Sequence, residues 1–361
     1  MPMKGKGDHM ESTRELEANH GSATGEHFRK PPVLYVVIPC YNEEDVLPIT
    51  STLFKNEVEL LASRGKIVPG SRIMLVDDGS KDSTWNIIQQ LASEDDTFVG
   101  VKLSRNKGHQ NALLAGLSEA SRFCDASISI DCDGQDDIAA MERMVDAYLD
   151  GCDVVYGVRS SRETDTFFKR VSAESFYRIL EKMGVETVFN HADYRLLSAR
   201  VLDELSRYHE TNVFLRGMIP LVGFRSTSVL YERHERIAGR SHYPLSKMLA
   251  LAADGVTSLS IKPVRIITCL GLVISALSFI GVIWAVVTAL LGSGVAGWAS
   301  TVCIVCFMGG IQLLCLGVIG EYVGKTYLET KHRPRYIVDY ATYDESLRID
   351  RRDHDGRTTR L

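Results

Sequence analysis

Acidic residues stand directly after three short apolar runs in the first half of the chain: Glu43, the pair Asp77 and Asp78, and the pair Asp131 and Asp133. The D-x-D pair can hold a divalent cation such as Mg²⁺ or Mn²⁺, because these ions favour carboxylate and phosphate oxygens. A nucleotide diphosphate and water would then supply the other ligands. Standing alone, the same spacing often marks only a turn or a helix cap, so its meaning depends on the rest of the chain.

Two further segments offer groups for a nucleotide. One carboxylate of Asp77 or Asp78 can accept a base N–H from the Watson–Crick edge of uracil or guanine, while Gly79 permits a tight turn. Residues 106–111 (N-K-G-H-Q-N) precede an Ala- and Leu-rich stretch, and their backbone N–H groups and Lys107 can face phosphate. A plain helix start explains residues 106–111 nearly as well, whereas no turn requires two adjacent carboxylates.

Alternating apolar runs and amphipathic stretches must position these residues. The apolar runs predict strands near residues 34–38, 73–76, 99–103, 127–130 and 154–156. The stretches between them predict helices near residues 45–63, 82–93, 108–121 and 137–150. Continuous apolar runs separated by helices are typical of parallel strands covered on both faces, and ligands bind beyond the carboxyl ends of such strands. The acidic residues are therefore predicted to share one site in an α/β domain with a mostly parallel sheet.

Two apolar segments follow, residues 266–291 and 298–320, and neither contains a charged residue. Each exceeds the roughly 20 residues needed to cross a hydrocarbon core, so both predict transmembrane helices, at about 264–291 and 298–323. Lysines and arginines flank both outer ends, which by the positive-inside rule predicts a multi-pass protein of the cytoplasmic membrane with its N-terminal domain in the cytoplasm. Residues 243–262 predict an amphipathic helix at the interface or an ordinary linker helix.

Composition narrows the class of protein. The chain has 361 residues and a formal net charge of −5, which argues against a general nucleic-acid binder. Its eight cysteines fall in or beside apolar segments, as expected of small buried hydrophobes in a reducing compartment. Residues 1–30 are polar and predict a disordered tail without a cleavable signal peptide. Residues 31–242 are the predicted catalytic domain, and residues 326–361 a cytoplasmic C-terminal tail.

Seven motifs in order, followed by two spans, resemble family 2 glycosyltransferases. They are P-C-Y-N-E-E (39–44), V-D-D-G-S-K-D (76–82), N-K-G-H-Q-N-A-L-L-A-G-L (106–117), D-C-D-G-Q-D (131–136), G-V-R (157–159), D-Y-R-L-L (193–197) and A-G-R-S-H-Y-P (238–244). The set is most similar to polyprenyl-phosphate glycosyltransferases of the bactoprenol glucosyltransferase and dolichol-phosphate mannose synthase types. The resemblance covers about residues 33–325. It implies a Rossmann-like glycosyltransferase-A fold, a nucleotide-sugar donor, a Mg²⁺ or Mn²⁺ ion and a polyprenyl phosphate acceptor.

The resemblance also implies roles for individual residues. Those expected around the nucleotide are Pro39, Tyr41, Glu43 and Asp78, joined by Asp77, Lys107 and Asp131. Those expected to hold the metal and diphosphate are Asp131, Asp133 and Gln135. Asp193 would lie near the transferred sugar, as a base or as a group that orients a hydroxyl, and Arg159 and Arg240 would bind phosphate. The other arginines of residues 157–240, Arg216 among them, are equally explained as solvated or packing side chains.

Two positions depart from the family pattern. Asp137 stands where Pro is usual, which removes a rigid turn and adds a carboxylate near the expected metal. His242 stands where Lys is usual, which replaces a fixed positive charge with a group that titrates near neutral pH.

The predicted activity is transfer of a sugar with inversion, by single displacement, for modification of a cell-envelope glycan. UDP-glucose with undecaprenyl phosphate is favoured and GDP-mannose is the alternative. A processive polysaccharide synthase is disfavoured because the chain has no Q-x-x-R-W motif and too few spans to enclose a channel. A membrane sensor of nucleotide sugars without catalysis is the non-enzymatic alternative. Gly309, Gly310 and Gly317 permit close packing of spans, as in a homo-oligomer.

Overall fold

The computed structural model of the chain describes residues 29–160, 191–211, 213–233, 260, 262–291 and 298–343. Its strands are β1 (Leu34–Cys40), β2 (Arg72–Asp77), β3 (Phe98–Leu103), β4 (Ala126–Ser129), β5 (Val154–Arg159), β6 (His191–Ser198), β7 (Ser226–Tyr231) and β8 (Val338–Ala341). They form one eight-stranded sheet of order β7-β5-β6-β4-β1-β2-β3-β8.

Among the described residues, six helices accompany the sheet and two extend away from it. They are α2 (Leu47–Ser63), α3 (Thr84–Glu94), α4 (His109–Ala120), α5 (Ala140–Leu149), α7 (Ala199–Ser206), α8 (Leu215–Leu221), α10 (Lys262–Leu290) and α11 (Trp298–Thr330). The five strands and four helices predicted for the first half of the chain are confirmed, with ends that differ by a few residues. The α/β fold class is likewise confirmed.

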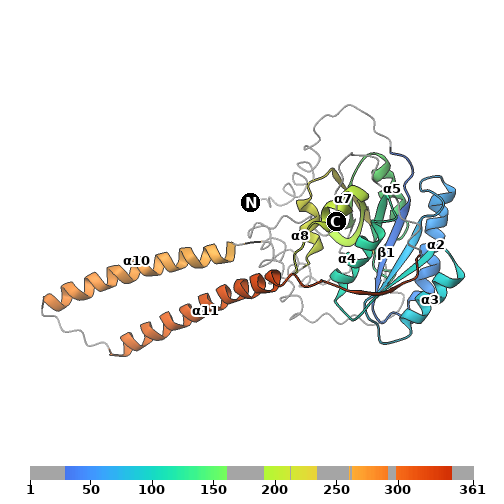
Figure 1. Ribbon diagram of the computed structural model, residues 1–361. Helices are drawn as coiled ribbons and strands as arrows, with labels where there is room; N and C mark the ends of the chain where they lie inside the picture. The colour runs from blue at the N-terminus through green and yellow to red at the C-terminus, as the bar shows by residue number, and fades with distance from the viewer. Residues whose placement is uncertain are drawn as a thin grey trace, which may run out of the picture.

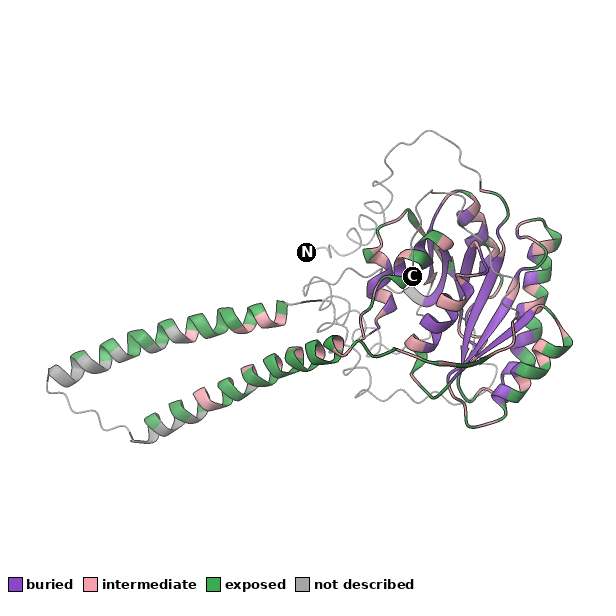
Figure 2. Cartoon of the chain, viewed as in Figure 1, coloured by how far each residue is buried: buried purple, intermediate pink, exposed green. Residues whose placement is uncertain are grey.

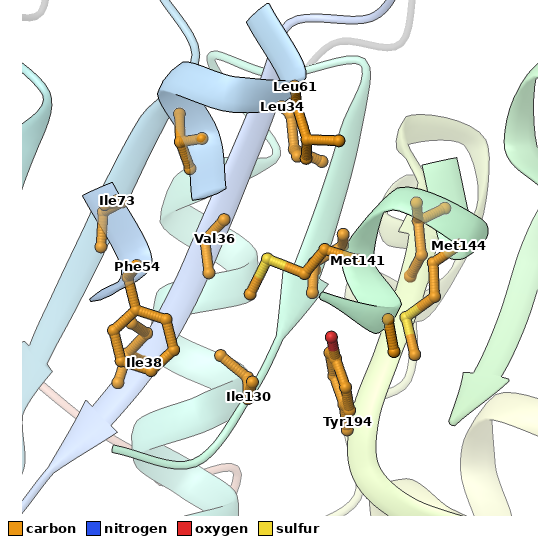
Figure 3. Close-up of a cluster of buried hydrophobic side chains, with 14 of the residues drawn as sticks. Leu34, Val36, Ile38, Phe54, Leu61, Ile73, Ile130, Met141, Met144 and Tyr194 are labelled. Carbon is orange, nitrogen blue, oxygen red and sulfur yellow. The ribbon is translucent and has the colours of Figure 1, made fainter. Parts of the chain in front are cut away.

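Both faces of the sheet are buried, and the side chains of β1 contribute to a core cluster on each face. Leu34, Val36 and Ile38 point into a cluster beneath α2, α3 and α5, part of which Figure 3 shows. Tyr35 and Val37 point into a second cluster, beneath α4, α7 and α8. Successive side chains of a strand alternate between faces, so helices on both sides require an apolar residue at every position. The uninterrupted apolar runs of the sequence are the consequence.

The direction in which successive strands are added to the sheet changes between β1 and β4: β2 and β3 lie on one side of β1, and β4 lies on the other. The polar loops lie at this point. β1 pairs in parallel with both β2 and β4. β6 runs antiparallel to β4 and to β5, so its first residues lie beside the carboxyl ends of these two strands. A ligand crevice is expected at such a reversal in an α/β sheet. The loops after β1, β2 and β4 and the start of β6 all meet there.

The chain returns to the sheet after α11. β8 pairs antiparallel with β3, the Thr342 N–H donates to the Gly100 carbonyl at 2.9 Å, and the Gly100 N–H donates to Thr342 Oγ1 at 2.8 Å. The sequence prediction of a tail over residues 326–361 therefore differs from the structure at residues 338–342. The local pattern V-D-Y-A carries little strand signal, and it is the open edge of β3, more than two hundred residues earlier, that gives this strand its partner.

Helices α10 and α11 leave the α/β unit side by side (Figure 1). By length and composition, Lys262–Gly281 and Phe307–Thr330 are apolar enough to cross a membrane, and neither segment is buried within the protein. Figure 2 shows that the described residues of both helices are largely exposed. Leu272, Phe279 and Leu313 are among their exposed large apolar side chains. The second helix continues to Thr330, past the predicted end near residue 323. The predicted amphipathic helix at residues 243–262 falls almost wholly outside the described residues.

Candidate active site

The loops after β1 and β2 are joined by crossing hydrogen bonds. The Asn42 N–H donates to Ser80 Oγ at 3.0 Å, and Asn42 Oδ1 accepts the Lys81 N–H at 2.9 Å. The Glu43 N–H donates to Thr84 Oγ1 at 2.8 Å. Asn42 adopts a left-handed φ of 55°, which Asn tolerates better than most residues. The two motifs 39–44 and 76–82 thus form a single prearranged surface.

Asp78 joins a third loop to this surface. Its carboxylate oxygens accept the backbone N–H groups of Lys107 at 2.7 Å and Gly108 at 2.9 Å. Burial raises the pKa of Asp78 even though both N–H groups favour its charged form. Asp78 therefore organises the segment before α4, and Lys107 contributes its backbone to that bond.

Gly79 fixes the distance between these loops. It has a φ of 67°, and a Cβ at this position would lie 2.5 Å from the backbone nitrogen of Asn106. Only glycine allows both the left-handed conformation and this close approach. The neighbouring Asp77 is fully buried; its Oδ1 accepts the Ser80 N–H at 3.1 Å, while Oδ2 has no hydrogen-bond partner among the described residues. Of the two carboxylates, Asp77 is thus the one with an uncommitted oxygen.

The start of β6 brings Asp193 to the same edge of the sheet. Arg216 donates to it through two nitrogens, Nε to Oδ1 at 3.3 Å and Nη2 to Oδ2 at 3.2 Å. Arg195 donates to Oδ1 from a fully buried position, and Gln110 Nε2 donates to Oδ2 at 3.2 Å. Asp193 is therefore surrounded by positive charge and hydrogen-bond donors from β6, α4 and α8.

His109 connects Asp193 to the D-x-D pair. Its Nε2 lies 3.4 Å from Asp193 Oδ2 and 3.5 Å from Asp131 Oδ1. Burial lowers the pKa of His109, but the two carboxylates outweigh it and raise the pKa above its usual value. The residue that begins α4 thus bridges the expected metal side and the expected sugar side of the site.

The two bridged carboxylates have opposite pKa shifts. Burial would raise the pKa of Asp193, but Arg216, Arg195 and His109 hold it well below its ordinary range. Burial raises the pKa of Asp131, and the nearby charges of Asp193 and Asp133 raise it further against the opposing effect of His109. Asp193 is thus stably ionised, whereas Asp131 lacks a compensating cation of similar strength.

The residues expected to hold a metal are close in sequence but form no complete cage. Among the described residues, no group of three or more His, Cys, Asp and Glu side chains is arranged to hold an ion. Asp133 is mostly buried and its Oδ1 accepts the Gln135 N–H at 3.1 Å. Gln135 Oε1 accepts a hydrogen bond from Arg233. Any ion here would need further oxygen ligands from a bound diphosphate or water.

Arg159 lies at the end of β5, beside Asp136 and Tyr231. Its Nε donates to the Tyr231 hydroxyl at 3.3 Å, and Tyr231 in turn donates to Asp136 Oδ1 at 2.8 Å. Arg159 Nη2 lies 3.6 Å from the same carboxylate oxygen. Burial raises the pKa of Asp136, an effect that Arg159 opposes. This arginine is held in place at the rim of the site by a tyrosine and a carboxylate.

The departure at Asp137 has a local structural role. Its Oδ1 accepts the Ala139 N–H at 3.1 Å and its Oδ2 lies 3.9 Å from Arg143, both at the start of α5. The carboxylate that the sequence adds is thus engaged with this helix start. Arg240 and His242, the other candidates beyond β7, lie outside the described residues.

The structure places the predicted residues in two neighbouring groups. The nucleotide-side residues Pro39 and Tyr41 lie at the end of β1 and in the loop that follows, where Tyr41 is 41% exposed. Four residues around Asp193 were not predicted as functional: His109, Gln110, Arg195 and Arg216. His109, Gln110 and Arg195 stand inside quoted motifs, which was the available signal. Nothing in the local sequence distinguished Arg216 from the other arginines.

Known proteins resemble the chain along most of its length. The model of glycosyl transferase family 2 matches residues 35–206, and that of the GtrB C-terminal hairpin matches residues 262–326. The uncharacterized glycosyltransferase YkoT of Bacillus subtilis is 48% identical over 88% of this chain and 94% of the relative. The bactoprenol glucosyl transferase of Shigella phage SfV is 38% identical over 84% of this chain and 97% of the relative.

Solved structures are more distant. A mannosyltransferase from Pyrobaculum calidifontis, PcManGT in complex with GDP-Man and Mn²⁺, is 14% identical, covers 88% of this chain and 92% of its own, and has a TM-score of 0.42. The family match, together with the mostly parallel sheet, identifies an enzyme of the glycosyltransferase class with a glycosyltransferase-A-like α/β domain. The chain belongs to glycosyl transferase family 2, and its two apolar helices correspond to the GtrB C-terminal hairpin.

Proposed function

We propose that this glycosyltransferase moves a sugar from a nucleotide-sugar donor to a membrane polyprenyl phosphate, with inversion at the anomeric carbon. The observation that carries the proposal is the bridge from Asp131 through His109 to Asp193 at the sheet reversal. It joins the diphosphate side of the site to the sugar side. The bactoprenol glucosyl transferases among the relatives support the lipid acceptor.

A divalent cation fits the charges of this site. Asp131 and Asp133 would hold it, together with the Gln135 amide oxygen once that group leaves Arg233, since these are the oxygen ligands that Mg²⁺ and Mn²⁺ accept. The raised pKa of Asp131, caused by burial and two neighbouring carboxylates, is the kind of imbalance that a bound cation offsets. Such an ion would neutralise charge on the departing nucleoside diphosphate.

The protein's own groups would mainly position the reactants. The surface formed by residues 39–44 and 76–82 would receive the nucleoside, with the free Asp77 oxygen as the acceptor for a base N–H. The N–H-rich turn at Lys107 and Gly108 is already held by Asp78, so little reorganisation is needed on binding. An ionised lipid phosphate is already a nucleophile and needs no strong base.

Asp193 would orient the sugar. A carboxylate whose pKa lies well below its usual range is a weak base, which favours a role in accepting a hydrogen bond from a sugar hydroxyl. Arg216, which is about one-third exposed, would complete the positive surface on this side of the site. Arg159 and Arg240 remain the candidates for holding the acceptor phosphate, since guanidinium forks match phosphate geometry.

The donor sugar, the membrane topology and the use of the product are also part of the proposal. UDP-glucose is the favoured donor because several relatives are bactoprenol glucosyl transferases, and GDP-mannose is the alternative. The helix pair α10 and α11 would cross the cytoplasmic membrane twice, with the α/β unit in the cytoplasm beside the lipid phosphate. The lipid-linked sugar would then serve modification of a cell-envelope glycan.

The test uses the full-length protein in membrane vesicles with polyprenyl phosphate and a panel of nucleotide sugars. We expect one donor to give a lipid-linked product that is lost on adding EDTA and restored by Mg²⁺ or Mn²⁺. Asp133→Ala should abolish product while the protein remains folded and membrane-bound. Asp137→Ala is the matched control, because its carboxylate faces the start of α5 and should leave transfer within a few-fold of normal.

Two results would count against the proposal. Near-normal turnover of Asp133→Ala would remove the metal assignment. Tight binding of a nucleotide sugar, with no lipid-linked product from any donor, would favour the alternative of a non-catalytic membrane sensor.

A further inference from the structure

The C-terminal end of α11 is bonded directly to the α/β unit. Glu329, one residue before the end of this helix, accepts two hydrogen bonds from Thr211: the backbone N–H donates to Oε1 at 2.7 Å and the hydroxyl donates to Oε2 at 3.1 Å. Both oxygens of one carboxylate thus hold both donors of one residue. A two-point bond of this kind fixes orientation as well as distance.

Thr211 stands just before the segment that supplies Arg216. Helix α8 begins four residues later, at Leu215, whose N–H donates to Gln110 Oε1 at 3.2 Å. The same Gln110 side chain donates through Nε2 to Asp193, and Arg216 reaches Asp193 with both Nε and Nη2. The start of α8 is therefore fastened to the Asp193 carboxylate at two places and, through Thr211, to the end of the long apolar helix.

The chain beyond α11 makes a second attachment. Tyr336, Val338 and Tyr343 pack against the core cluster beneath α4, and β8 joins the edge of the sheet. The Tyr343 hydroxyl bonds Glu119 of α4, the helix that also carries Gln110. The α/β unit therefore contacts both the last turn of α11, through Thr211, and the chain that follows this helix.

Charged side chains are also partly buried at this junction. Glu210 and Arg335 each carry a buried side-chain atom, Oε2 and Nη1, with no hydrogen-bond partner among the described residues. Burial raises the pKa of Glu210, and the nearby Glu329 carboxylate raises it further, against the opposing effect of Arg335. Glu329 thus lies near a second carboxylate, and Arg335 supplies the nearby positive charge.

We propose that Glu329 is a positioning residue for sugar transfer: through Thr211 it sets the start of α8, so that Arg216 and Gln110 hold Asp193 in its reactive orientation. The inference rests on the proposed function, and it names the contact by which a membrane-seated helix would control that site. Among the described residues, the loops after β1 and β2 on the nucleotide side are bonded to each other, whereas α8 is bonded to Gln110 and Asp193.

The activity test compares Glu329→Ala with Glu321→Ala in the full-length protein in vesicles. Glu321 lies on the same helix and is more than half exposed, and its ion-pair distance to Lys325 is 4.0 Å. We expect Glu329→Ala to lower kcat by roughly 10- to 100-fold, the effect of a misplacement of about 1 Å in a catalytic constellation. The KM for the nucleotide sugar should stay within twofold of normal, and kcat is counted per folded enzyme, because a loss of folded protein would lower the apparent kcat without changing KM.

Thr211 provides the rescue. Thr211→Ala removes one of the two donors and should lower kcat in part, whereas Thr211→Ser keeps both donors and should restore it. In an Arg216→Ala background, Glu329→Ala should cause little further loss, because the two residues act along one path. A full further loss in that background would overturn the proposal, as would a kcat for Glu329→Ala equal to that of Glu321→Ala.

A second measurement does not depend on any substrate. Backbone hydrogen exchange at residues 215–218 should become about tenfold faster in Glu329→Ala and not in Glu321→Ala, because α8 loses its anchor. If no donor gives a lipid-linked product in the unaltered protein, the proposed function fails while this exchange result still decides the role of Glu329. Unchanged exchange at α8 would overturn the inference even in an active enzyme.

Discussion

Asp78 and Asp193 lie at the same edge of the sheet, yet different kinds of group bond to their carboxylates. Asp78 accepts two backbone N–H groups from the loop before α4, and no arginine contacts it among the described residues. Asp193 receives Arg195, Arg216 and Gln110 side chains from three different elements. The pKa of Asp78 is raised by burial, whereas the pKa of Asp193 is held well below its usual range by the arginines.

The difference indicates how each half of the site is built. Main-chain donors in short loops are placed by local conformation, so the nucleotide side is arranged once β1 and β2 pair. Side-chain charges from β6, α4 and α8 meet only after distant segments pack together. The first half should therefore respond to changes in loop geometry, and the second half to changes in charge.

The largest effect is expected from Asp193→Ala. It leaves the guanidinium of Arg195, which is fully buried, without its carboxylate, and breaking a buried pair in this way costs about 3–5 kcal/mol. Denaturant unfolding in detergent micelles would measure the loss. Asp193→Ala combined with Arg195→Met should recover much of it, and the exposed Asp96→Ala should change the free energy of unfolding by less than about 0.5 kcal/mol. Equal losses in the single and double variants would contradict this account.

A smaller loss is expected on the nucleotide side. Asp78→Ala leaves the N–H groups of Lys107 and Gly108 without their acceptor. Because Lys107 is half-buried and Gly108 is exposed, water can replace part of the bonding, and the loss should be about 1 kcal/mol. The KM for the nucleotide sugar should rise, because the loop before α4 is no longer held, while Asp78→Asn keeps one acceptor and should lie between. A fall in kcat with unchanged KM would place Asp78 on the sugar side instead.

Loop geometry alone is tested by a matched pair of glycines. Gly79 and Gly65 have φ values of 67° and 68°, but a Cβ at Gly65 would meet nothing within 4 Å. Gly65→Ala should cost about 1–2 kcal/mol for the left-handed backbone. Gly79→Ala should cost about 1–3 kcal/mol more, since its Cβ would overlap the Asn106 backbone. Similar unfolding free energies for the two variants would show that the close approach is unimportant.

The smallest expected effect is on the pH dependence of the free energy of unfolding, where Asp193 and Asp78 should act in opposite directions. The lowered pKa of Asp193 means that its charge stabilises the fold above the unfolded value of about 3.9, a contribution lost as pH falls through the lower folded pKa. The raised pKa of Asp78 means that the folded chain binds more protons between about 3.9 and the folded pKa, so this residue's contribution to stability rises as pH falls.

The free energy of unfolding of the wild type, Asp193→Asn and Asp78→Asn, measured as a function of acidic pH, gives the slope of stability against pH for each protein. On acidification, the wild type should lose its advantage over Asp193→Asn and gain stability relative to Asp78→Asn. Slopes of the same sign for both comparisons would mean that the two carboxylates are not neutralised differently.

The sequence by itself determined the strands and helices up to residue 156, the family, and the acidic residues that follow β1, β2 and β4. Each of these depends on local order: apolar runs, their spacing, and motifs that keep their sequence. The apolar lengths of α10 and α11 were readable for the same reason, since a long uncharged helix is a property of consecutive residues.

Only the tertiary structure decided which partners surround these carboxylates. The antiparallel placement of β6 brings Asp193 beside Asp131, and α8 brings Arg216 to it from 23 residues further along the chain. The same holds for β8 and for the bond between Glu329 and Thr211, which joins residues 118 apart. Such contacts depend on loop closure and packing between distant segments, and no local pattern encodes them.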